Sequence, residues 1–374
     1  MNKALPYIVF SLLMLPMLSC SQDIDFPSSP LQISYEPINT DFNNPWSFLF
    51  LPDGSMLVTE KTGELYHVID GVKNPQPIAG LPDIYVRGQG GLMDLELHPN
   101  YEENGWIYLS YGFSTNNQKG GNTTVARARL SDHTLTDFSV IFKASPVSRK
   151  GQHWGGRLEF DTEGFLYISV GDRGARDENP QTLDNSNGKI HRIHDDGTIP
   201  TDNPFVGQAS AVSSIFSYGH RNPQGLALQK STGLLWSHEH GPKGGDELNV
   251  IRAGNNYGWP VITYGRNYSG TIITKETERE GMEQPSYYWV PSIAPCGMTF
   301  VDSDIYPEWQ GSVLIGSLKF NYIHRCTIDG ETIVAHEKVV EDIGRVRTVR
   351  QGPDGYIYAS VEGKGLFKLI PEVR

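Results

Sequence analysis

One hairpin motif recurs six times along this chain of 374 residues, and it constrains the fold more than any other feature. Each copy has a polar turn that ends in glycine, followed at once by a run of β-forming residues. The six glycines are Gly54, Gly105, Gly164, Gly233, Gly311 and Gly355. Radial closure of such units leaves only short, protected strand edges. The repeat therefore predicts an all-β fold, a six-bladed β-propeller, with a stacked sandwich or a β-solenoid as the alternatives.

A second short strand precedes most of these turns, so the repeating unit is strand, turn, strand. These earlier strands are expected at residues 46–51, 92–97, 157–160, 225–228 and 346–350. Successive glycines are 51, 59, 69, 78 and 44 residues apart. A blade of four strands needs about 40–50 residues, so the excess belongs in loops. The two longest intervals follow Gly164 and Gly233, where we expect additional loop structure.

Composition agrees with short aromatic strands joined by tight turns, because the chain contains 40 Gly, 24 Pro, 18 Tyr, 15 Phe and 7 Trp. The formal net charge of −12 argues against a nucleic-acid partner. An anionic ligand would have to be bound by local positive groups against this overall charge.

The N-terminus has the features of an export signal: Lys3, an apolar run over residues 4–18, and then Ser19 and Cys20. The apolar run is too short for a spanning helix. The Leu-Ser-Cys break resembles a bacterial lipobox, which makes residues 1–19 a lipoprotein signal peptide, residues 20–34 a flexible tether and residues 35–374 the propeller. We expect an exported protein on the periplasmic side of a bacterial envelope, anchored to the outer membrane through Cys20. An ordinary cleaved signal is the alternative.

Two further cysteines, Cys296 and Cys326, are too few for a thiolate metal cluster. In an oxidising compartment they could form one disulfide, or they could be two buried thiols.

The hairpin alignment predicts which side chains meet on one face. If the glycine turns lie at one end of the hairpins, the other rim carries residues about ten before each glycine and six to eight after it, given a rise of about 3.3 Å per residue. The upstream positions hold Gln89, His153, Arg221, Asn222, Arg345 and Arg347, and the downstream positions hold Asp172, Arg173, Glu239, His240 and Lys319. Ionisable groups from several units therefore gather on one rim, where a central site would be built.

The chemistry of this rim suits an anionic ligand and a general base. Arginine offers rigid donor forks matched to carboxylates or phosphates, and the cations expected to bind such a ligand are Arg221, Lys319, Arg345 and Arg347. His153 is the natural base, because histidine titrates near neutral pH, and its apolar and glycine neighbours are expected to leave room for a ligand. No serine-hydrolase elbow, phosphate loop or zinc-protease motif occurs. His238 and His240 would share a strand face without a clear third ligand, which does not favour zinc.

These residues also carry a family resemblance. The segments GQGGLMDLELHP, HWGGRLEF, VGDRG, YGHRNPQGLAL, HGPKGGDELNVIRAGNNYGWP, PSIAP, GSLKF and RVRTVRQGPDG occur in this order between residues 45 and 369. They resemble the pyrroloquinoline-quinone-dependent aldose sugar dehydrogenases and the related soluble glucose dehydrogenases. The resemblance implies a six-bladed propeller that holds the quinone and calcium over one face.

The resemblance also implies roles for individual residues. His153 matches the base that takes the proton from the anomeric hydroxyl of an aldose, before hydride transfer to the quinone gives a lactone. Gln89 matches a polar contact near the sugar and the quinone, while Arg221 and Asn222 match groups that hold and polarise the quinone. The matches to quinone-carboxylate binders are Lys319, Arg345 and Arg347. Calcium ligands are implied at the carbonyls of Gly241 and Pro242, and at a further, structural site at Glu247 and Tyr257.

Three positions depart from the glucose enzymes, namely Gln152, His240 and Arg173. We expect these positions to lie close to the sugar, which favours broad aldose oxidation over glucose specificity. The resemblance implies an aldose substrate and an electron acceptor that the motifs do not identify. We expect the protein to contact the membrane only through its lipid anchor.

Two other functions fit a propeller of this size. A non-catalytic binding module would not need His153 together with Arg221, Lys319, Arg345 and Arg347. A calcium-dependent lactone hydrolase would need several carboxylates on the axis, whereas the expected rim is cationic.

Overall fold

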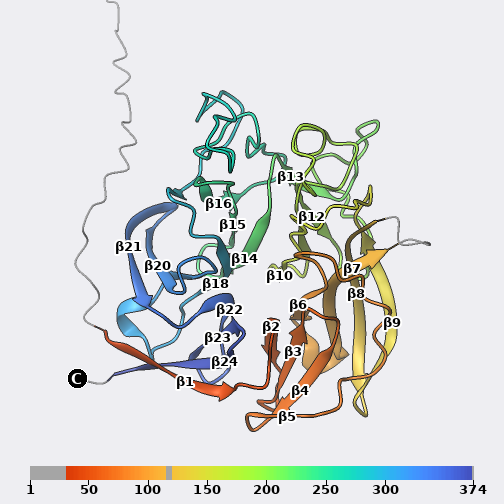
Figure 1. Ribbon diagram of the computed structural model, residues 1–374. Coiled ribbons are helices and arrows are strands. Elements are labelled where there is room, and N and C mark those ends of the chain that lie inside the picture. The colour runs from red at the N-terminus through yellow and green to blue at the C-terminus, as the bar shows by residue number, and fades with distance from the viewer. Residues whose placement is uncertain (1–30, 115–119, 373–374) are drawn as a thin grey trace, which may run out of the picture.

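The computed structural model describes residues 31–114 and 120–372, and these residues form six four-stranded antiparallel sheets arranged as blades around a central axis (Figure 1). The innermost strands of the six blades surround the axis, and each blade continues outward in sequence order, except that the outermost strand of the last blade is β1. The predicted six-bladed β-propeller is therefore confirmed.

The first three blades follow the order of the chain. Blade 1 contains β2 (Pro45–Phe50), β3 (Met56–Glu60), β4 (Leu65–Ile69) and β5 (Val72–Lys73). Blade 2 contains β6 (Leu92–Leu97), β7 (Trp106–Ser114), β8 (Gly121–Ser131) and β9 (Thr134–Lys143). Blade 3 contains β10 (Leu158–Phe160), β11 (Leu166–Val170), β12 (Lys189–Ile193) and β13 (Ile215–Tyr218).

The remaining three blades follow, and the last of them combines strands from both ends of the described chain. Blade 4 contains β14 (Pro223–Gln229), β15 (Leu234–Glu239), β16 (Asp246–Ile251) and β17 (Tyr287–Trp289). Blade 5 contains β18 (Pro295–Phe300), β19 (Val313–Ser317), β20 (Ile323–Asp329) and β21 (Thr332–Val340). Blade 6 contains β22 (Arg345–Gln351), β23 (Ile357–Glu362), β24 (Gly365–Pro371) and β1 (Ile33–Asn39). The pairing of β1 with β24 closes the ring.

The six repeat glycines occupy equivalent places, each between the first and second strands of a blade. All six have positive φ angles between 68° and 85°, which glycine adopts more readily than other residues. The expected inner strands are found, and a sixth, β18, completes the set. The long intervals after Gly164 and Gly233 are loops over residues 171–188, 194–214 and 252–286. Helix is limited to one turn at α1 (Tyr101–Asn104) and the 3-10 turn η1 (Pro307–Trp309) in the described chain.

The hydrophobic core consists of six wedges, one between each pair of neighbouring blades. Between blades 1 and 2, for example, Leu49 and Leu57 pack with Leu92 and Leu109. Between blades 6 and 1, Tyr358 packs with Phe48. Each blade therefore buries both of its faces, so no blade completes its core alone.

Arg157, which directly precedes β10, joins all the blades at the axis. Its side chain is 3% exposed, and it contacts the innermost strand of each of the five other blades. The contacts are the Trp46 ring (4.0 Å from the guanidinium carbon), Asp94 Oδ1 (3.5 Å), the Gln224 carbonyl (2.8 Å), Cys296 Sγ (3.4 Å) and Thr348 Oγ1 (2.8 Å). A single buried cation therefore connects the six inner strands.

The two cysteines are free, buried thiols, which settles the alternative left open above. Cys296 lies on β18 beside the Arg157 guanidinium, whereas Cys326 lies on β20 within the wedge between blades 4 and 5. Burial raises the pKa of Cys326 well above its ordinary value.

The predicted signal peptide, Cys20 and most of the tether lie outside the described residues, so the lipid anchor stays a prediction. The first strand begins at Ile33, close to the expected domain start at residue 35. Among the described residues, no helix has the length and apolar character needed to cross a membrane.

We predict that Arg157→Met lowers the free energy of unfolding by about 3–5 kcal/mol, because it leaves the buried acceptors on Gln224 and Thr348 without their donor and removes one of the two cations beside the buried Asp94 carboxylate. Chemical denaturation of the purified protein measures this change. Arg129→Met is the control, since its pair with Asp137 is solvent-exposed and should cost at most about 1 kcal/mol. Equal losses in the two variants would show that Arg157 has no special role at the axis.

Candidate active site

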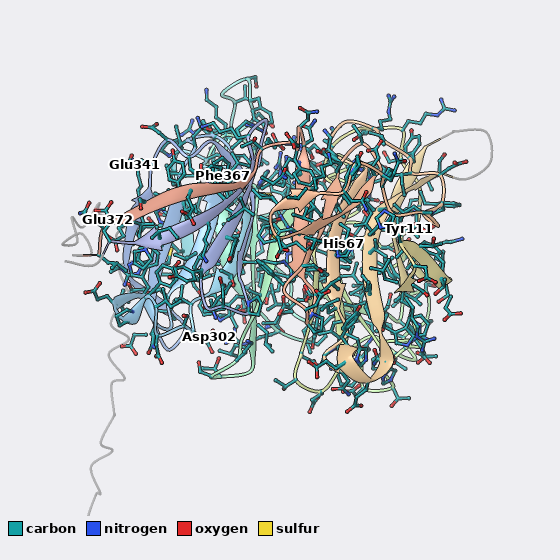
Figure 2. The ribbon with its side chains drawn as sticks, turned by 90° about the horizontal axis from the view of Figure 1, so that it is seen from below. His67, Tyr111, Asp302, Glu341, Phe367 and Glu372 are labelled. Carbon is teal, nitrogen blue, oxygen red and sulfur yellow. The ribbon has the colours of Figure 1, made fainter. Side chains whose placement is uncertain are left out.

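A cavity of about 550 Å³ opens at one end of the axis, at the rim where the inner strands begin. It is lined by Gln89, His153, Asp172, Arg221, Pro242 and Trp259, among others. Six of the residues singled out from the sequence are therefore brought together, namely Gln89, Gln152, His153, Asp172, Arg221 and Pro242. The opposite face contains the repeat turns, and Figure 2, which shows the disc edge-on, places Asp302 and Glu341 toward opposite faces.

A larger cavity of about 730 Å³ lies at that opposite end of the axis. Its walls include Asp94, Glu96 and Glu159, but Arg157 and Arg350 lie among these carboxylates. Arg350 lies 3.4 Å from Asp94 Oδ1 and 2.7 Å from Glu96 Oε2. The charges of this cavity are therefore largely paired internally, and it contains no histidine that could act as a base.

The backbone of His153 adopts a left-handed conformation, with φ of 55°, which a non-glycine residue rarely takes. The Gln89 side chain stabilises it, because its Oε1 accepts a 2.7 Å hydrogen bond from the His153 amide. The neighbouring Gly155 and Gly156 do not open space for a ligand, contrary to our expectation. A Cβ on Gly155 would lie 2.6 Å from the Ser169 carbonyl oxygen, and one on Gly156 would lie 2.7 Å from Met93 Sδ. These glycines permit close backbone packing.

The His153 imidazole is oriented by Asp172, which follows β11. Its Nδ1 lies 2.6 Å from Asp172 Oδ1, and the Asp172 side chain is 1% exposed. Burial opposes ionisation of this carboxylate, but the hydrogen bond and charge of His153 outweigh burial and lower the Asp172 pKa. An ionised Asp172 takes the Nδ1 proton as an acceptor, which leaves Nε2 of His153 as the basic nitrogen. Sequence reasoning placed Asp172 on the rim but assigned it no role.

Burial lowers the His153 pKa below its ordinary value, and the positive charge of Arg221 lowers it further. The imidazole is therefore neutral at neutral pH, which a general base requires.

Arg221 is held by the loop that follows β15. Its Nη1 donates to the carbonyls of His240 (2.8 Å) and Gly241 (3.0 Å), and its amide donates to Glu239 Oε2. The neighbouring Asn222 uses Oδ1 to accept a 3.2 Å hydrogen bond from the Gly155 amide, next to His153. The buried Glu239 carboxylate therefore anchors the turn that presents Arg221 and Asn222.

Lys319, Arg345 and Arg347 form a second cationic group, on blades 5 and 6, and do not line the His153 cavity. Glu362 on β23 accepts hydrogen bonds from Arg345 Nε (2.8 Å) and Arg347 Nε (3.0 Å), so the two arginines share one face of β22. Arg345 also donates to the carbonyl of Leu318, next to Lys319. Burial opposes ionisation of Glu362, but the two arginines outweigh it and lower its pKa to about 2.

His240 lies between the two cationic groups. Burial lowers its pKa well below the ordinary value, and both Arg221 and Arg347 contribute to the lowering. Its Nε2 lies 2.7 Å from the Pro295 carbonyl, and the side chain does not line the cavity.

Of the three positions that depart from the glucose enzymes, Gln152 lines the cavity, whereas His240 and Arg173 do not. Arg173 is fully buried behind the His153 loop, with its guanidinium carbon 3.6 Å above the Trp154 ring. It donates to the carbonyls of Gln152 (2.5 Å) and Lys150 (3.0 Å). Arg173 therefore holds the loop that carries the base, a long-range role that local sequence does not reveal.

The expected calcium ligands occupy two places. Pro242 lines the cavity, and the Gly241 carbonyl already accepts one hydrogen bond from Arg221, which leaves it a second lone pair. Glu247 lies opposite Glu239 across β15 and β16, and the nearby Asn249 Oδ1 is buried without a hydrogen-bond partner among the described residues. Burial raises the Glu247 pKa well above its ordinary value, and the charge of Glu239 raises it further.

Two facing carboxylates and an unsatisfied amide oxygen are donors that suit a hard cation such as calcium. The Tyr257 hydroxyl is engaged with the Val250 carbonyl at 2.6 Å, so this residue could offer a metal only its backbone carbonyl.

Fold and site together define a six-bladed propeller with a histidine–aspartate pair and clustered cations at one end of its axis. The family model of the glucose/sorbosone dehydrogenases matches residues 42–368, and the chain belongs to this family. The resemblance inferred from the sequence is thereby confirmed, and family membership supports activity as a sugar oxidoreductase.

The similarity to individual proteins is consistent with this family assignment. The chain is 42% identical over 353 residues to the aldose sugar dehydrogenase YliI of Escherichia coli, covering 92% of this chain and 94% of that protein. The apo-form structure of the soluble aldose sugar dehydrogenase from Escherichia coli superposes with a TM-score of 0.86 at 39% identity, covering 91% and 100% of the two chains. The PQQ-bound aldose sugar dehydrogenase of Streptomyces coelicolor gives a TM-score of 0.74 at 26% identity, covering 92% and 100%.

We predict that Glu247→Gln stabilises the metal-free protein, raising its melting temperature by about 2–4 °C at neutral pH, the equivalent of about 1 kcal/mol. The folded-state pKa of Glu247 is raised, so its penalty exists above the unfolded pKa and vanishes in acid, where both states are protonated. Calcium should stabilise the wild type more than the variant. Scanning calorimetry with chelator or calcium measures both effects, with the exposed Glu163→Gln as control. A less stable metal-free variant would contradict the interpretation.

Proposed function

We propose that this chain oxidises aldose sugars at the anomeric carbon to lactones, with pyrroloquinoline quinone as hydride acceptor and calcium as its partner ion. The observation that carries the proposal is the His153–Asp172 pair, placed in one cavity with Arg221 and beside a second cationic group. Membership of the glucose/sorbosone dehydrogenase family and the PQQ-bound structural relative support the choice of reaction and cofactor.

His153 is the general base. Asp172 holds the imidazole with Nδ1 as donor, so Nε2 accepts the proton of the anomeric hydroxyl. Its lowered pKa keeps that nitrogen free of a proton at neutral pH. Loss of the hydroxyl proton pushes electron density onto the anomeric carbon, which favours departure of its hydrogen as hydride. When bound, the quinone supplies the electrophilic centre that accepts this hydride.

The cationic groups fit a quinone that carries three carboxylates. Lys319, Arg345 and Arg347 would bind carboxylates, with Arg345 and Arg347 kept parallel by Glu362. Arg221, fixed by two carbonyls, places positive charge beside the base, where it would hold and polarise the quinone together with Asn222. The carbonyls of Gly241 and Pro242 would bind calcium, whose charge makes a bound quinone a stronger acceptor of electrons.

Gln89 and Gln152 supply polar groups for the sugar. Gln89 Oε1 is occupied by the His153 amide, so its Nε2 donors remain available to a ligand. The cavity is lined mainly by polar and charged groups, which suit the hydroxyl groups of a sugar.

A lactone hydrolase with calcium on the axis fits these residues less well. The axial carboxylates Asp94, Glu96 and Glu159 lie at the opposite end from His153 and face Arg157 and Arg350. Within the described residues, no group of three or more histidine, cysteine or carboxylate side chains has a geometry that could hold a metal ion.

The proposed function is tested by reconstitution of the apoprotein with pyrroloquinoline quinone and calcium, followed by dye reduction across a panel of aldoses. We expect stoichiometric quinone binding, sugar-dependent dye reduction and one lactone per two electrons. Absence of quinone-dependent reduction with every aldose, or hydrolysis of sugar lactones without quinone, would overturn the proposal.

We predict that His153→Gln lowers kcat by about 10²–10⁴-fold, the usual contribution of a positioned general base, while quinone content stays near that of the wild type. The wild type should lose activity in acid as His153 protonates, with a midpoint below the ordinary histidine value of about 6.5, because the folded-state pKa is lowered. Steady-state kinetics from pH 4 to 9 and absorbance of bound quinone measure these effects.

His194→Gln, at the end of β12 and away from the cavity, is the matched control and should behave as wild type. Substantial turnover of His153→Gln with an unchanged acid limb would place the base elsewhere.

We predict that Arg345→Ala and Arg347→Ala each weaken quinone binding by about 1.5–3 kcal/mol, because each removes a charged donor for a carboxylate. This corresponds to roughly 10–100-fold in Kd, measured by fluorescence titration of the apoprotein. Arg129→Ala, in an exposed pair on blade 2, is the control. Normal quinone affinity combined with a raised KM for sugar would assign these arginines to the substrate instead.

A further inference from the structure

The indole of Trp259 lies at the wall of the cavity, between the two charged groups closest to the base. Its Nε1 donates a 2.9 Å hydrogen bond to Asp172 Oδ2. The guanidinium carbon of Arg221 lies 5.4 Å from the centre of its ring. Trp259 is 7% exposed, and the exposed edge lines the cavity. This side chain therefore contacts both the orienting carboxylate and the cation beside His153.

The backbone around Trp259 fixes the indole in this place. The Trp259 amide donates to the Gly219 carbonyl at 2.9 Å, and its own carbonyl accepts a 2.8 Å hydrogen bond from Gln181 Nε2. The Gln181 amide also pairs with Asn256 through two hydrogen bonds of 3.0 and 2.8 Å. Residues 256–259 are thus tied to the loops that precede β12 and β14, which accounts for the NNYGWP segment singled out in the sequence.

The acceptor sites of Asp172 show why the indole matters. Oδ1 accepts from His153 Nδ1 and from the Gly174 amide, both at 2.6 Å. Among the described residues, Trp259 supplies the hydrogen bond to Oδ2. The carboxylate is nearly fully buried, so each donor to it carries more weight than it would in water.

We propose that Trp259 is a positioning residue for His153, because its N–H orients and holds the ionised Asp172 carboxylate that sets the tautomer and basicity of the imidazole. The assignment of His153 as base rests on the proposed function, but the Trp259–Asp172–His153 hydrogen-bonded chain is a property of the protein alone.

The direction in which loss of the Trp259 N–H shifts the His153 pKa follows from the charges around His153 and Asp172. His153 faces Asp172, Arg173 and Arg221, and Asp172 is also within the influence of the buried Lys189. Loss of the indole N–H leaves Asp172 with one donor fewer and its negative charge less stabilised, while the three cations are unchanged. The carboxylate then attracts the His153 proton more strongly, so the proton affinity of His153 rises.

The test is Trp259→Phe, which keeps an aromatic ring in the wall and removes the N–H. In the apoprotein, NMR titration of labelled histidines should show the His153 midpoint shifted upward by about half a unit or more. Trp289→Phe is the matched control: its Nε1 is buried without a hydrogen-bond partner in the described chain, so the His153 midpoint should not move. Trp259→His, which keeps a ring N–H, should give an intermediate midpoint and also serves if the Phe variant does not fold.

In the reconstituted enzyme, the acid limb of the kcat/KM profile should shift to higher pH in Trp259→Phe by the same amount, with quinone affinity unchanged. A lowered kcat at every pH with an unmoved midpoint would show a merely structural role and overturn the proposal, as would an unchanged NMR midpoint. If the wild type oxidises no sugar, the proposed function fails, yet the NMR titration of the apoprotein still decides the role of Trp259.

Discussion

The contact on which the rest of the structure depends is the Arg157 guanidinium at the axis. Six four-stranded blades could pack against their neighbours through the apolar wedges without any contact that fixes the positions of their inner strands at the axis. A planar group with five N–H donors, buried against Trp46 and hydrogen-bonded to groups on other inner strands, sets the distances between those strands. Because side chains at the starts of these strands form the cavity, the geometry of the site follows from this contact.

At the rim, too, charged side chains are held in place by partners of opposite charge. An acidic protein presents a cationic site because buried or partly buried carboxylates hold its positive groups in place. Glu362 keeps Arg345 and Arg347 side by side, and Glu239 fixes the turn of Arg221 through backbone amides. Asp172 does the equivalent for the imidazole of His153. Asp172 and Glu239 are buried and Glu362 is partly buried, so their interactions are screened less than those of exposed carboxylates.

The fold and part of the candidate site could be predicted from the sequence. The fold follows from six glycines at one turn position, since a local signal repeated six times leaves few architectures. The rim membership of His153 and Arg221 follows from strand length and direction. The direction of each side chain does not follow, because it depends on pairings far apart in the chain. Arg173 turned out to be buried under Trp154, and the glycines after His153 pack against neighbouring strands.

The hydrogen-bond partners of individual side chains were equally hard to predict from the sequence. The roles of Asp172 and Trp259 join loops 87 residues apart, and the buried Cys296 thiol lies beside Arg157, from another blade. Only the resemblance to known dehydrogenases linked the rim to a quinone and calcium. Composition and spacing alone indicated an anionic ligand and a base.

The most direct test of the account is an anaerobic single turnover of the reconstituted protein with an aldose deuterated at the anomeric carbon. If a hydrogen leaves that carbon as hydride while His153 takes the hydroxyl proton, quinone reduction should be several-fold slower than with the protiated sugar. One lactone should form per quinone reduced. Reduction without any isotope effect in a chemically limited turnover, or lactone formation that is independent of the quinone, would contradict the account.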